Sequence, residues 1–529
     1  MDKKQLRSFI FRHLDGVVVP SVIHQLSKKG VTEFLLKKQQ VDLEEISREF
    51  NANEGYLNVA LRVLASQGFL NYELNNAENK VLISVNENSE KAFSFAETYR
   101  ELATFLADSE LINSKLISDE LGHKWMKLYE KFRSVLLEEL DEKSLEYQIQ
   151  KHIEGALISP VIVKLGMSGM FHKYFMEASF SADEFHKNPN CFGNILDGLT
   201  ELGWFSKKNQ NYQFTEKGLF FARRASAYGV TVSYLPMFAK MENLLFGKAN
   251  EIREIEIGDE EIHVDREMNV WGSGGAHSTY FKVLDEFILD IFNRPLNEQP
   301  KGILDMGCGN GALLQHLYDI IDRQTLRGKH LDEHPLFLVG ADYNQAALKV
   351  TRANLIKNDI WAKVIWGDIG NPQKLAEDLK SDYEINLGDL LNIRTFLDHN
   401  RIWEDVLQMD ANKISSSTGA FAFRGKRLSN SDVEENLLQH LKKWTPYVEK
   451  FGLLLIELHT LPPEITSKNL GKTAATAYDA THGFSDQYIV EVDVFHRICK
   501  ESGLNPDGNL FKKFPDSELA TVSINLLRK

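Results

Sequence analysis

The chain has 529 residues, too many for one hydrophobic core, and this length predicts three or four domains. With 43% hydrophobic and 26% charged residues, the composition is that of an ordinary globular protein, while a net charge of −14 argues against broad binding to nucleic acid or to an anionic membrane. The sequence contains no membrane-spanning apolar run and begins with no secretory signal, so we expect a cytoplasmic protein.

The N-terminal half contains an internal repeat. Residues 12–26 match residues 151–165 at a constant offset, and each copy leads to a helix with a similar end, at residues 64–70 and 199–205. An alternating polar segment with turn residues at its centre follows each helix, as in a β-hairpin. Helices closed by a hairpin and present twice predict two winged-helix-like units that arose by duplication.

In a DNA-binding winged helix, residues 51–67 would form the helix that enters the major groove. The first part of this helix carries one arginine, Arg62, and one glutamate, Glu54. Because binding to DNA requires several cations that neutralise phosphates, DNA binding is not expected here. Between the two units, residues 93–150 have apolar residues at helical spacing, which predicts helices that pack on a core.

A segment rich in glycine precedes the second half of the chain. Residues 268–281 combine several glycines and serines with Trp271, His277 and Tyr280. This composition suits a core poorly, and a lid over a bound cofactor is about as plausible as not. Residues 281–292 then predict an apolar helix that leads into the next strand.

The most specific pattern of the chain lies at residues 302–314. A short apolar run ends in Asp305, passes through Gly307, Gly309 and Gly311, and continues with helical spacing. Glycines allow the backbone to approach a nucleotide-like ligand, and the N-terminus of the helix offers unpaired N–H groups to its polar end. The spacing Asp-x-Gly-x-Gly-x-Gly resembles the first motif of class I S-adenosylmethionine-dependent methyltransferases.

The next two predicted strands also end in acids. Residues 335–342 end in Asp342, which could bind ribose hydroxyls, and residues 362–368 end in Asp368. In the methyltransferase family an acid at the place of Asp368 contacts the adenine amino group. Each aspartate alone is more often a turn residue, but three acids in this order favour a cofactor site. The further residues predicted to bind the cofactor are Tyr343, Ile369, His277 and Tyr280.

The remaining strands complete an α/β fold. Residues 383–393 and 452–459 predict the fourth and fifth strands, and residues 509–514 and 519–527 predict an antiparallel hairpin at the end of the chain. We therefore predict a Rossmann-like, seven-stranded class I methyltransferase sheet, preceded by a mostly helical N-terminal half with duplicated winged-helix-like units.

Several histidines follow strands of this sheet. His399 and His459 each come after a strand end, where ligands bind in open parallel sheets, and a predicted loop at residues 477–488 adds His482, Gln487 and two acids. Such a set predicts a mononuclear metal site with imidazole, carboxylate and amide ligands, and simple acid/base histidines are the alternative. The basic cluster at residues 423–427 suits a phosphate, an acidic carrier protein or a solvated loop equally well.

A closer resemblance supports the metal hypothesis. Residues 396–401 and 482–488 and the glycine segment around Trp271 are similar to those of the metal-dependent C-methyltransferases of polyketide loading modules, the apratoxin type. The resemblance implies S-adenosylmethionine and a divalent iron or manganese ion as cofactors. It implies that His482 and Gln487, together with His459, hold the metal, and that malonyl-type units on an acyl carrier are methylated.

Carbon methylation requires a carbanion equivalent, and a divalent ion chelated by a 1,3-dicarbonyl or 2-oxo acid stabilises the enolate. We propose His399 as the base that removes the proton, so that His399 and His459 are the candidate catalytic residues. The expected methyl acceptor is a small or carrier-bound carbonyl acid.

Two other functions remain open, a metal-free O- or N-methyltransferase of a small molecule and a DNA-binding regulator with a methyltransferase-like sensor domain. The sequence also leaves a homodimer open. The predicted domains are a first winged-helix-like unit, a helical connector, a second unit with lid helices, and the methyltransferase domain, at residues 1–92, 93–150, 151–260 and 261–529.

Overall fold

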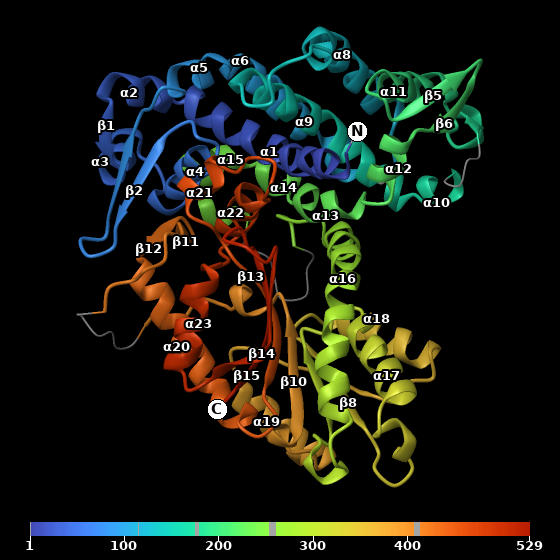
Figure 1. The fold of residues 1–529 in the computed structure, drawn as a ribbon. Coiled ribbons are helices and arrows are strands. Elements are labelled where there is room, and N and C mark those ends of the chain that lie inside the picture. The colour runs from blue at the N-terminus through green and yellow to red at the C-terminus, as the bar shows by residue number, and fades with distance from the viewer. Residues whose placement is uncertain (1, 115, 175–178, 253–260, 407–412) are drawn as a thin grey trace.

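The computed structural model describes residues 2–114, 116–174, 179–252, 261–406 and 413–529. A helical N-terminal half lies above a domain built on one large sheet, and a long helix runs from the first part down along the second (Figure 1). Within the described residues, no helix is long and apolar enough to cross a membrane.

The first unit of the N-terminal half is a set of helices closed by a small antiparallel sheet. Its strands have the order β1-β3-β2, and β2 and β3 form the predicted hairpin. The elements are α1 (Lys3–Lys28), α2 (Val31–Lys38), β1 (Gln40–Asp42), α3 (Leu43–Phe50), α4 (Glu54–Ser66), β2 (Asn71–Asn75) and β3 (Lys80–Ser84).

The second unit repeats this arrangement after a helical connector. Its strand order, β4-β6-β5, corresponds to β1-β3-β2, so the structure confirms the predicted pair of winged-helix units. The connector contains α5 (Ser89–Ser94), α6 (Ala96–Leu106), α7 (Ser109–Asn113) and α8 (Asp119–Leu136). The unit contains α9 (Leu145–Met167), α10 (Met170–Tyr174), β4 (Phe180–Ser181), α11 (Pro189–Glu201), β5 (Phe205–Lys208) and β6 (Asn211–Phe214).

The first helices of the two units, α1 and α9, cross at equivalent glycines. A Cβ atom on Gly16 would lie 2.4 Å from the carbonyl oxygen of His152, and a Cβ atom on Gly155 would lie 2.4 Å from that of His13. Only glycine therefore permits this approach of the two backbones. The contacts are reciprocal, as they are across the two-fold axis of a symmetric dimer.

Two tyrosines extend this symmetry. The hydroxyl of Tyr228, which follows the second unit, forms a hydrogen bond of 3.0 Å with Nδ1 of His13 in the first unit. The hydroxyl of Tyr99, which follows the first unit, lies 2.8 Å from Nδ1 of His152 in the second. Each unit thus closes the polar core of the other, and the N-terminal half has the internal symmetry of a fused dimer.

Within the described residues, five α-helices lead to the large sheet, and the last of them corrects a prediction. They are α12 (Glu216–Ala222), α13 (Ser226–Ser233), α14 (Leu235–Phe238), α15 (Met241–Phe246) and α16 (Arg266–Phe292). The predicted lid at residues 268–281 is part of α16 and not a loop. Asp265 caps the helix, because its side chain accepts a hydrogen bond of 2.9 Å from the backbone N–H of Met268. Gly272 serves close packing, since a Cβ there would lie 2.5 Å from the nitrogen of Val230 in α13.

Among the described residues, the large sheet has the predicted seven strands, and their order is β14-β15-β13-β10-β7-β8-β9. All neighbours are parallel except β15, which runs antiparallel to β13 and β14. The strands are β7 (Gly302–Met306), β8 (Phe337–Asp342), β9 (Lys363–Trp366), β10 (Leu390–Thr395), β13 (Leu453–Leu458), β14 (Asn505–Phe514) and β15 (Val522–Arg528). The helices around it are α17 (Ala312–Gln324), α18 (Gln345–Lys357), α19 (Pro372–Tyr383), α20 (Asn430–Val448) and α23 (Val492–Glu501).

Two other predicted segments differ from the structure. The fourth strand begins at Leu390 and not at residue 383, because residues 383–389 contain the end of α19 and a short 3₁₀ turn. The predicted loop at residues 477–488 is helical over most of its length, as α22 (Ala475–Gly483). The central strands β7 and β13 are buried along their whole length, which explains their continuous apolar runs.

Helix α4 of the first unit docks on the sheet domain. It packs against α21 (Pro463–Ser467), α22 and the hairpin of β11 (Phe421–Phe423) and β12 (Lys426–Leu428). Every residue from Gly55 to Ser66 is buried. The helix that would enter DNA in a regulator is therefore covered by the chain's own sheet domain.

Candidate active site

The glycine turn connects β7 to α17 and has the backbone geometry that only glycine adopts easily. Gly307, Gly309 and Gly311 have φ angles of 83°, 55° and 79°, all in the left-handed region. Beyond Gly309 the space is open, since the only atom within 4 Å of an added Cβ is the carbonyl oxygen of Gly307. The turn therefore leaves room for a ligand beside the N-terminus of α17.

Two of the three predicted acids lie beside this turn. Asp342, at the end of β8, accepts hydrogen bonds from the backbone N–H groups of Gly309 at 3.0 Å and Asn344 at 2.9 Å. Asp305 is 1% exposed, and its Oδ1 has no hydrogen-bond partner among the described residues. Burial, and then the charge of Asp342, raise the pKa of Asp305 to about 7. A buried acceptor without a partner suits a bound ligand with polar hydrogens.

The third acid lies at the end of the next strand, near an exposed aromatic pair. Asp368 accepts a hydrogen bond of 2.7 Å from the N–H of Gly370. The rings of Tyr343 and Trp366 lie 5.5 Å apart, and the indole N–H of Trp366 donates to the carbonyl oxygen of Tyr343 at 3.0 Å. The sequence did not single out Trp366, although its place two residues before Asp368 was a usable signal.

The structure says less about the other three residues that were predicted to bind the cofactor. Ile369 is buried, and its carbonyl oxygen accepts a hydrogen bond of 2.7 Å from the indole of Trp444. The ring of Tyr280 packs against Phe396 at 5.8 Å and Phe514 at 5.4 Å. The side chain of His277 lies outside the described residues. A cofactor-binding role for these three residues stays a prediction.

His399 follows β10 and is held by a glutamate from the neighbouring strand. Its Nδ1 donates a hydrogen bond to Oε1 of Glu457 in β13, and its backbone N–H donates to Oε2 of the same carboxylate at 3.2 Å. This carboxylate fixes the ring with the proton on Nδ1, so that Nε2 carries the lone pair. Within the described part of the chain, Nε2 of His399 has no hydrogen-bond partner.

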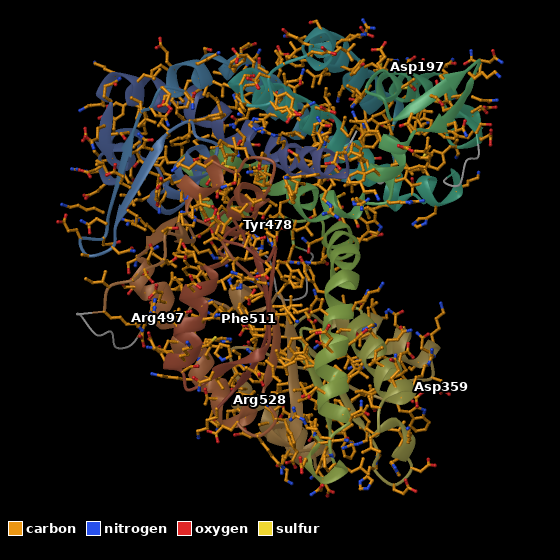
Figure 2. The ribbon with its side chains drawn as sticks, viewed as in Figure 1. Asp197, Asp359, Tyr478, Arg497, Phe511 and Arg528 are labelled. Carbon is orange, nitrogen blue, oxygen red and sulfur yellow. The ribbon has the colours of Figure 1, made fainter. Side chains whose placement is uncertain are left out.

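His482 lies in α22 and faces His399. The two ring centroids are 5.0 Å apart at an interplanar angle of 71°. Nδ1 of His482 donates to the carbonyl oxygen of Tyr478 at 2.8 Å. Tyr478 lies where the N-terminal half meets the sheet domain (Figure 2). Burial, and then the nearby His399, lower the pKa of His482 to about 3, so the ring is neutral at physiological pH.

Gln487 comes from the short segment after α22. Its Nε2 donates hydrogen bonds to Oγ of Ser485 at 3.0 Å and to the hydroxyl of Tyr234 at 3.2 Å. These bonds use both hydrogens of the amide, while Oε1 has no partner in the described segments. The amide therefore offers an acceptor atom, as a metal ligand must.

His459 does not fulfil the roles predicted for it. Its Nδ1 donates to the carbonyl oxygen of Val490 at 3.0 Å, and its Nε2 accepts from Oγ of Ser523 at 2.6 Å. The side chain is fully buried, and burial lowers its pKa to about 3. Because both nitrogens are bonded inside the core, the structure contradicts His459 as a metal ligand and as a catalytic base.

Among the described residues, no group of three or more histidines, cysteines, aspartates or glutamates could hold a metal ion. The structure brings together two imidazoles, His399 and His482, and the sequence predicted a metal role for only the second. The partnership of His399 with Glu457 was also missed, although Glu457 stands two residues before the predicted His459.

The basic cluster at residues 423–427 is largely paired within the protein. Arg427 donates to the carbonyl oxygen of Asn79 at 3.0 Å and lies 3.4 Å from the carboxylate of Glu54. The guanidinium of Arg424 lies 3.8 Å from Oδ2 of Asp486. These contacts join the β11–β12 hairpin to the first winged-helix unit and to the segment that carries Gln487.

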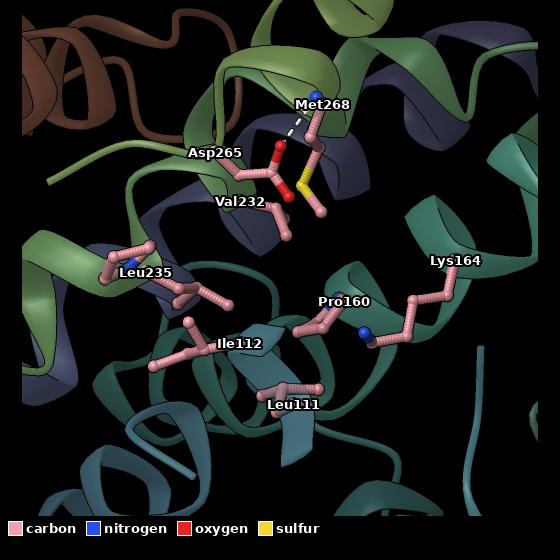
Figure 3. Close-up of a pocket in the computed structure, with 9 residues that line it drawn as sticks. Leu111, Ile112, Pro160, Lys164, Val232, Leu235, Asp265 and Met268 are labelled. Carbon is pink, nitrogen blue, oxygen red and sulfur yellow. Dashed lines mark hydrogen bonds between the residues drawn. The ribbon is translucent and has the colours of Figure 1, made fainter. Parts of the chain in front are cut away.

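A small cavity in the helical half is separate from these residues (Figure 3). Apolar side chains of α7, α9 and α14 line it, together with Lys164 and with Asp265 at the start of α16. The amine of Lys164 donates to the carbonyl oxygen of Ser114, and burial lowers its pKa to about 8. None of the predicted site residues lines this cavity.

Comparison with protein families decides the identity of the fold. The model of the AprA MT2-like domain, a methyltransferase domain, matches residues 261–525, half of the chain. The chain belongs to the AprA-like methyltransferase family. Models of the AprA winged helix domain and the AprA N-terminal domain also match, at residues 154–248 and 6–72. This AprA-like protein is thus an S-adenosylmethionine-dependent methyltransferase. The binding of that cofactor at the glycine turn and its acids stays a prediction.

Solved structures of methyltransferases are similar to this AprA-like chain at low identity. Mitomycin 7-O-methyltransferase MmcR aligns with 11% identity and a TM-score of 0.40, over 73% of this chain and 97% of that chain. Human N-acetylserotonin methyltransferase aligns with 14% identity and a TM-score of 0.39, over 74% and 99%. The CMeT domain of the citrinin polyketide synthase aligns with 12% identity and a TM-score of 0.36, over 80% and 96%. No curated protein matched the chain significantly.

Proposed function

We propose that this AprA-like enzyme methylates the carbon next to a carbonyl group in natural-product biosynthesis. The acceptor is a small or carrier-bound carbonyl acid of the malonyl or 2-oxo type, and the enzyme uses a divalent iron or manganese ion. The observation that supports this most is the facing pair of His399 and His482, whose rings lie 5.0 Å apart beside the strand ends.

The donor atoms at this place fit a metal ion. Each imidazole has Nδ1 occupied, by Glu457 for His399 and by the carbonyl oxygen of Tyr478 for His482. A second partner of this kind is what orients a metal-bound histidine, because it leaves Nε2 to the metal. Imidazole nitrogens and the amide oxygen of Gln487 are ligands that divalent iron and manganese accept. In this set of metal ligands, His399 takes the place of the predicted His459.

When bound, the metal would act as a Lewis acid that stabilises negative charge on the acceptor's carbonyl oxygens. The protein's own residues supply position. Glu457 and Asp342 lie near the ends of strands β13 and β8, at the edge of the sheet from which the glycine turn also starts. Holding acceptor and methyl donor at one edge favours in-line transfer from the sulfonium, because position is the main contribution that such a reaction needs.

A metal-free O- or N-methyltransferase is the second candidate, and the hydrogen bond between His399 and Glu457 favours it. A carboxylate that orients a histidine is the usual arrangement of a general base, which could remove a proton from a hydroxyl or amine. In this case His399 keeps the catalytic role predicted for it, and His482 and Gln487 would bind the acceptor.

One experiment separates the metal-dependent function from the metal-free function. It uses chelator-treated enzyme and labelled S-adenosylmethionine. Malonyl groups on a carrier protein, 2-oxo acids and phenols are offered with and without added Mn²⁺ or Fe²⁺. Our proposal predicts label on carbon with either the malonyl groups or the 2-oxo acids, and only when metal is added. Label on oxygen or nitrogen that persists in chelator would overturn it and support the second candidate.

A further inference from the structure

The segment after α22 that carries Gln487 is held by two tyrosines of the N-terminal half. The hydroxyl of Tyr56 in α4 donates a hydrogen bond of 2.6 Å to Oδ1 of Asp486. The hydroxyl of Tyr234, at the end of α13, accepts from Nε2 of Gln487 at 3.2 Å. Two residues that are distant in the chain therefore bind two consecutive residues of the catalytic domain.

Both tyrosines are fixed in position by their surroundings. Tyr56 is fully buried in the interface that α4 forms with α22, where its ring packs against Phe484 at 6.1 Å. Tyr234 is 4% exposed. Side chains packed in this way can impose an orientation on a partner, because their own rotamers are locked.

The segment itself needs external support. Asp486 has a φ angle of 56°, a left-handed conformation that non-glycine residues rarely adopt. Besides Tyr56, its carboxylate accepts from the backbone N–H of Arg424 at 3.3 Å and lies 3.8 Å from the guanidinium of the same residue. A strained residue persists where surrounding contacts hold it, and such residues cluster at ligand sites.

The hydrogen bonds of Gln487 also decide which end of its amide group is available. An amide group can turn end over end, and the two orientations differ only in the hydrogen bonds that they make. Oγ of Ser485 donates its own hydrogen to the carbonyl oxygen of Thr481 at 2.6 Å, so it can only accept from the amide nitrogen of Gln487, which leaves Oε1 as the available acceptor. The hydroxyl of Tyr234 holds the same nitrogen, and without it one of the two bonds that fix the position of this amide is lost.

We propose that Tyr56 and Tyr234 are positioning residues, through which the N-terminal half completes the metal site by orienting Asp486 and Gln487. The inference rests on the proposed metal site at His399, His482 and Gln487. It assigns the helical half a direct part in metal binding.

The test measures Mn²⁺ binding to the full-length enzyme by calorimetry, without substrate, for Tyr234→Phe, Tyr56→Phe and the double variant. Loss of a group that orients a ligand typically weakens metal affinity about 10-fold to 100-fold, and we expect this range for Tyr234→Phe. Tyr228→Phe is the matched control, because it removes a buried hydroxyl of the same helix that binds His13, away from the site. This control should leave Mn²⁺ affinity unchanged.

A double-mutant cycle separates positioning from a general loss of stability. In a Gln487→Ala background, Tyr234→Phe should cause no further loss of Mn²⁺ affinity, because the group that it orients is gone. Equal Mn²⁺ affinity of wild type and Tyr234→Phe, or additive losses in the cycle, would overturn the inference while the proposed metal site stands. If wild type itself binds S-adenosylmethionine but no Mn²⁺, the metal proposal fails and this inference fails with it.

Discussion

At the scale of single residues, the site depends on which nitrogen of each histidine is already bonded. His399 and His482 have Nδ1 bound to a protein acceptor, whereas both nitrogens of His459 are bonded in the core. His399 and His459 follow strand ends and His482 lies in a later segment, so position in the sequence did not distinguish them. The hydrogen bonds do: they leave Nε2 of His399 and of His482 available for the proposed site, and they engage both nitrogens of His459.

Replacing these histidines one at a time tests that division. His482→Asn should abolish or strongly weaken Mn²⁺ binding, because it removes one of the two imidazoles. His459→Asn should leave Mn²⁺ affinity unchanged and lower thermal stability, since the hydrogen bonds to Val490 and Ser523 are lost inside the core. Calorimetry and thermal unfolding measure the two effects. Loss of Mn²⁺ binding in a folded His459→Asn protein would return that residue to the site.

Asp15, at the crossing of α1 and α9, makes stability depend on pH. It is buried, its Oδ1 has no partner in the described part of the chain, and burial raises its pKa to about 7 from 3.8. The folded state therefore keeps a proton that the unfolded state loses. The stability that this proton contributes is complete below about pH 4 and is lost as pH rises to about 7, by about 1.4 kcal/mol per pH unit.

Asp15→Asn keeps the shape of the side chain and cannot ionise. We expect the stability of this variant relative to wild type to increase from pH 5 to pH 8, because only wild type must lose the proton or bury the charge. Urea unfolding at a series of pH values measures the difference. A difference between the two proteins that is constant over this range would show that Asp15 does not titrate in the fold.

At the scale of elements, glycines of α16 have two different environments. A Cβ on Gly272 would lie 2.5 Å from a backbone atom of α13, whereas a Cβ on Gly274 would have nothing within 4 Å. Composition alone could not separate the two positions, and the sequence therefore indicated a lid where the structure has a helix. The distinction comes from tertiary packing between α13 and α16.

These two glycines form a matched pair for mutation. Gly274→Ala should stabilise the protein by up to about 1 kcal/mol, because alanine favours a helix and the space is open. Gly272→Ala should destabilise it by about 1–3 kcal/mol, since the added methyl group forces α13 and α16 apart. Denaturant unfolding gives both values. Equal effects of the two substitutions would contradict the close packing of these helices.

Other elements were predicted because their signals are local. The glycine turn, the acids that end the strands and the two hairpins each lie within a few residues of sequence, and the structure has them. The pairing of His399 with Glu457 and of His459 with Ser523 spans many residues and depends on which strands become neighbours. In particular, the antiparallel strand β15 places Ser523 beside β13, which no local pattern indicates. The predicted domain boundaries stay a prediction.

At the scale of the whole molecule, the first winged-helix unit docks on the sheet domain through α4, and Arg62 is one of the residues that make this contact. Arg62 in α4 donates to Asp479 at 2.9 Å and to the carbonyl oxygen of Leu461 at 2.7 Å. The matching residue of the second unit is Asp197, which bonds Lys207 of its own hairpin at 2.6 Å and lies far from the sheet domain (Figure 2). The matching positions therefore carry opposite charges and make different contacts: Arg62 binds residues of the sheet domain, whereas Asp197 binds within its own unit.

The internal symmetry of the N-terminal half predicts the oligomeric state. Because α1 and α9 already form the reciprocal contact of a two-fold dimer within one chain, we expect the protein to be a monomer of 60.4 kDa. Size-exclusion chromatography with light scattering measures the mass. A stable dimer at micromolar concentration would show that another surface serves as the interface.

The central claim is that the methyl donor and a metal ion bind at one edge of the sheet, with His399 and His482 as the imidazole ligands. A crystal grown with Mn²⁺ and S-adenosylhomocysteine tests it most directly, by anomalous diffraction from the manganese. We predict one anomalous peak at bonding distance from Nε2 of both histidines, with the cofactor product over the glycine turn. A manganese peak elsewhere, or none beside a bound cofactor product, would contradict the account.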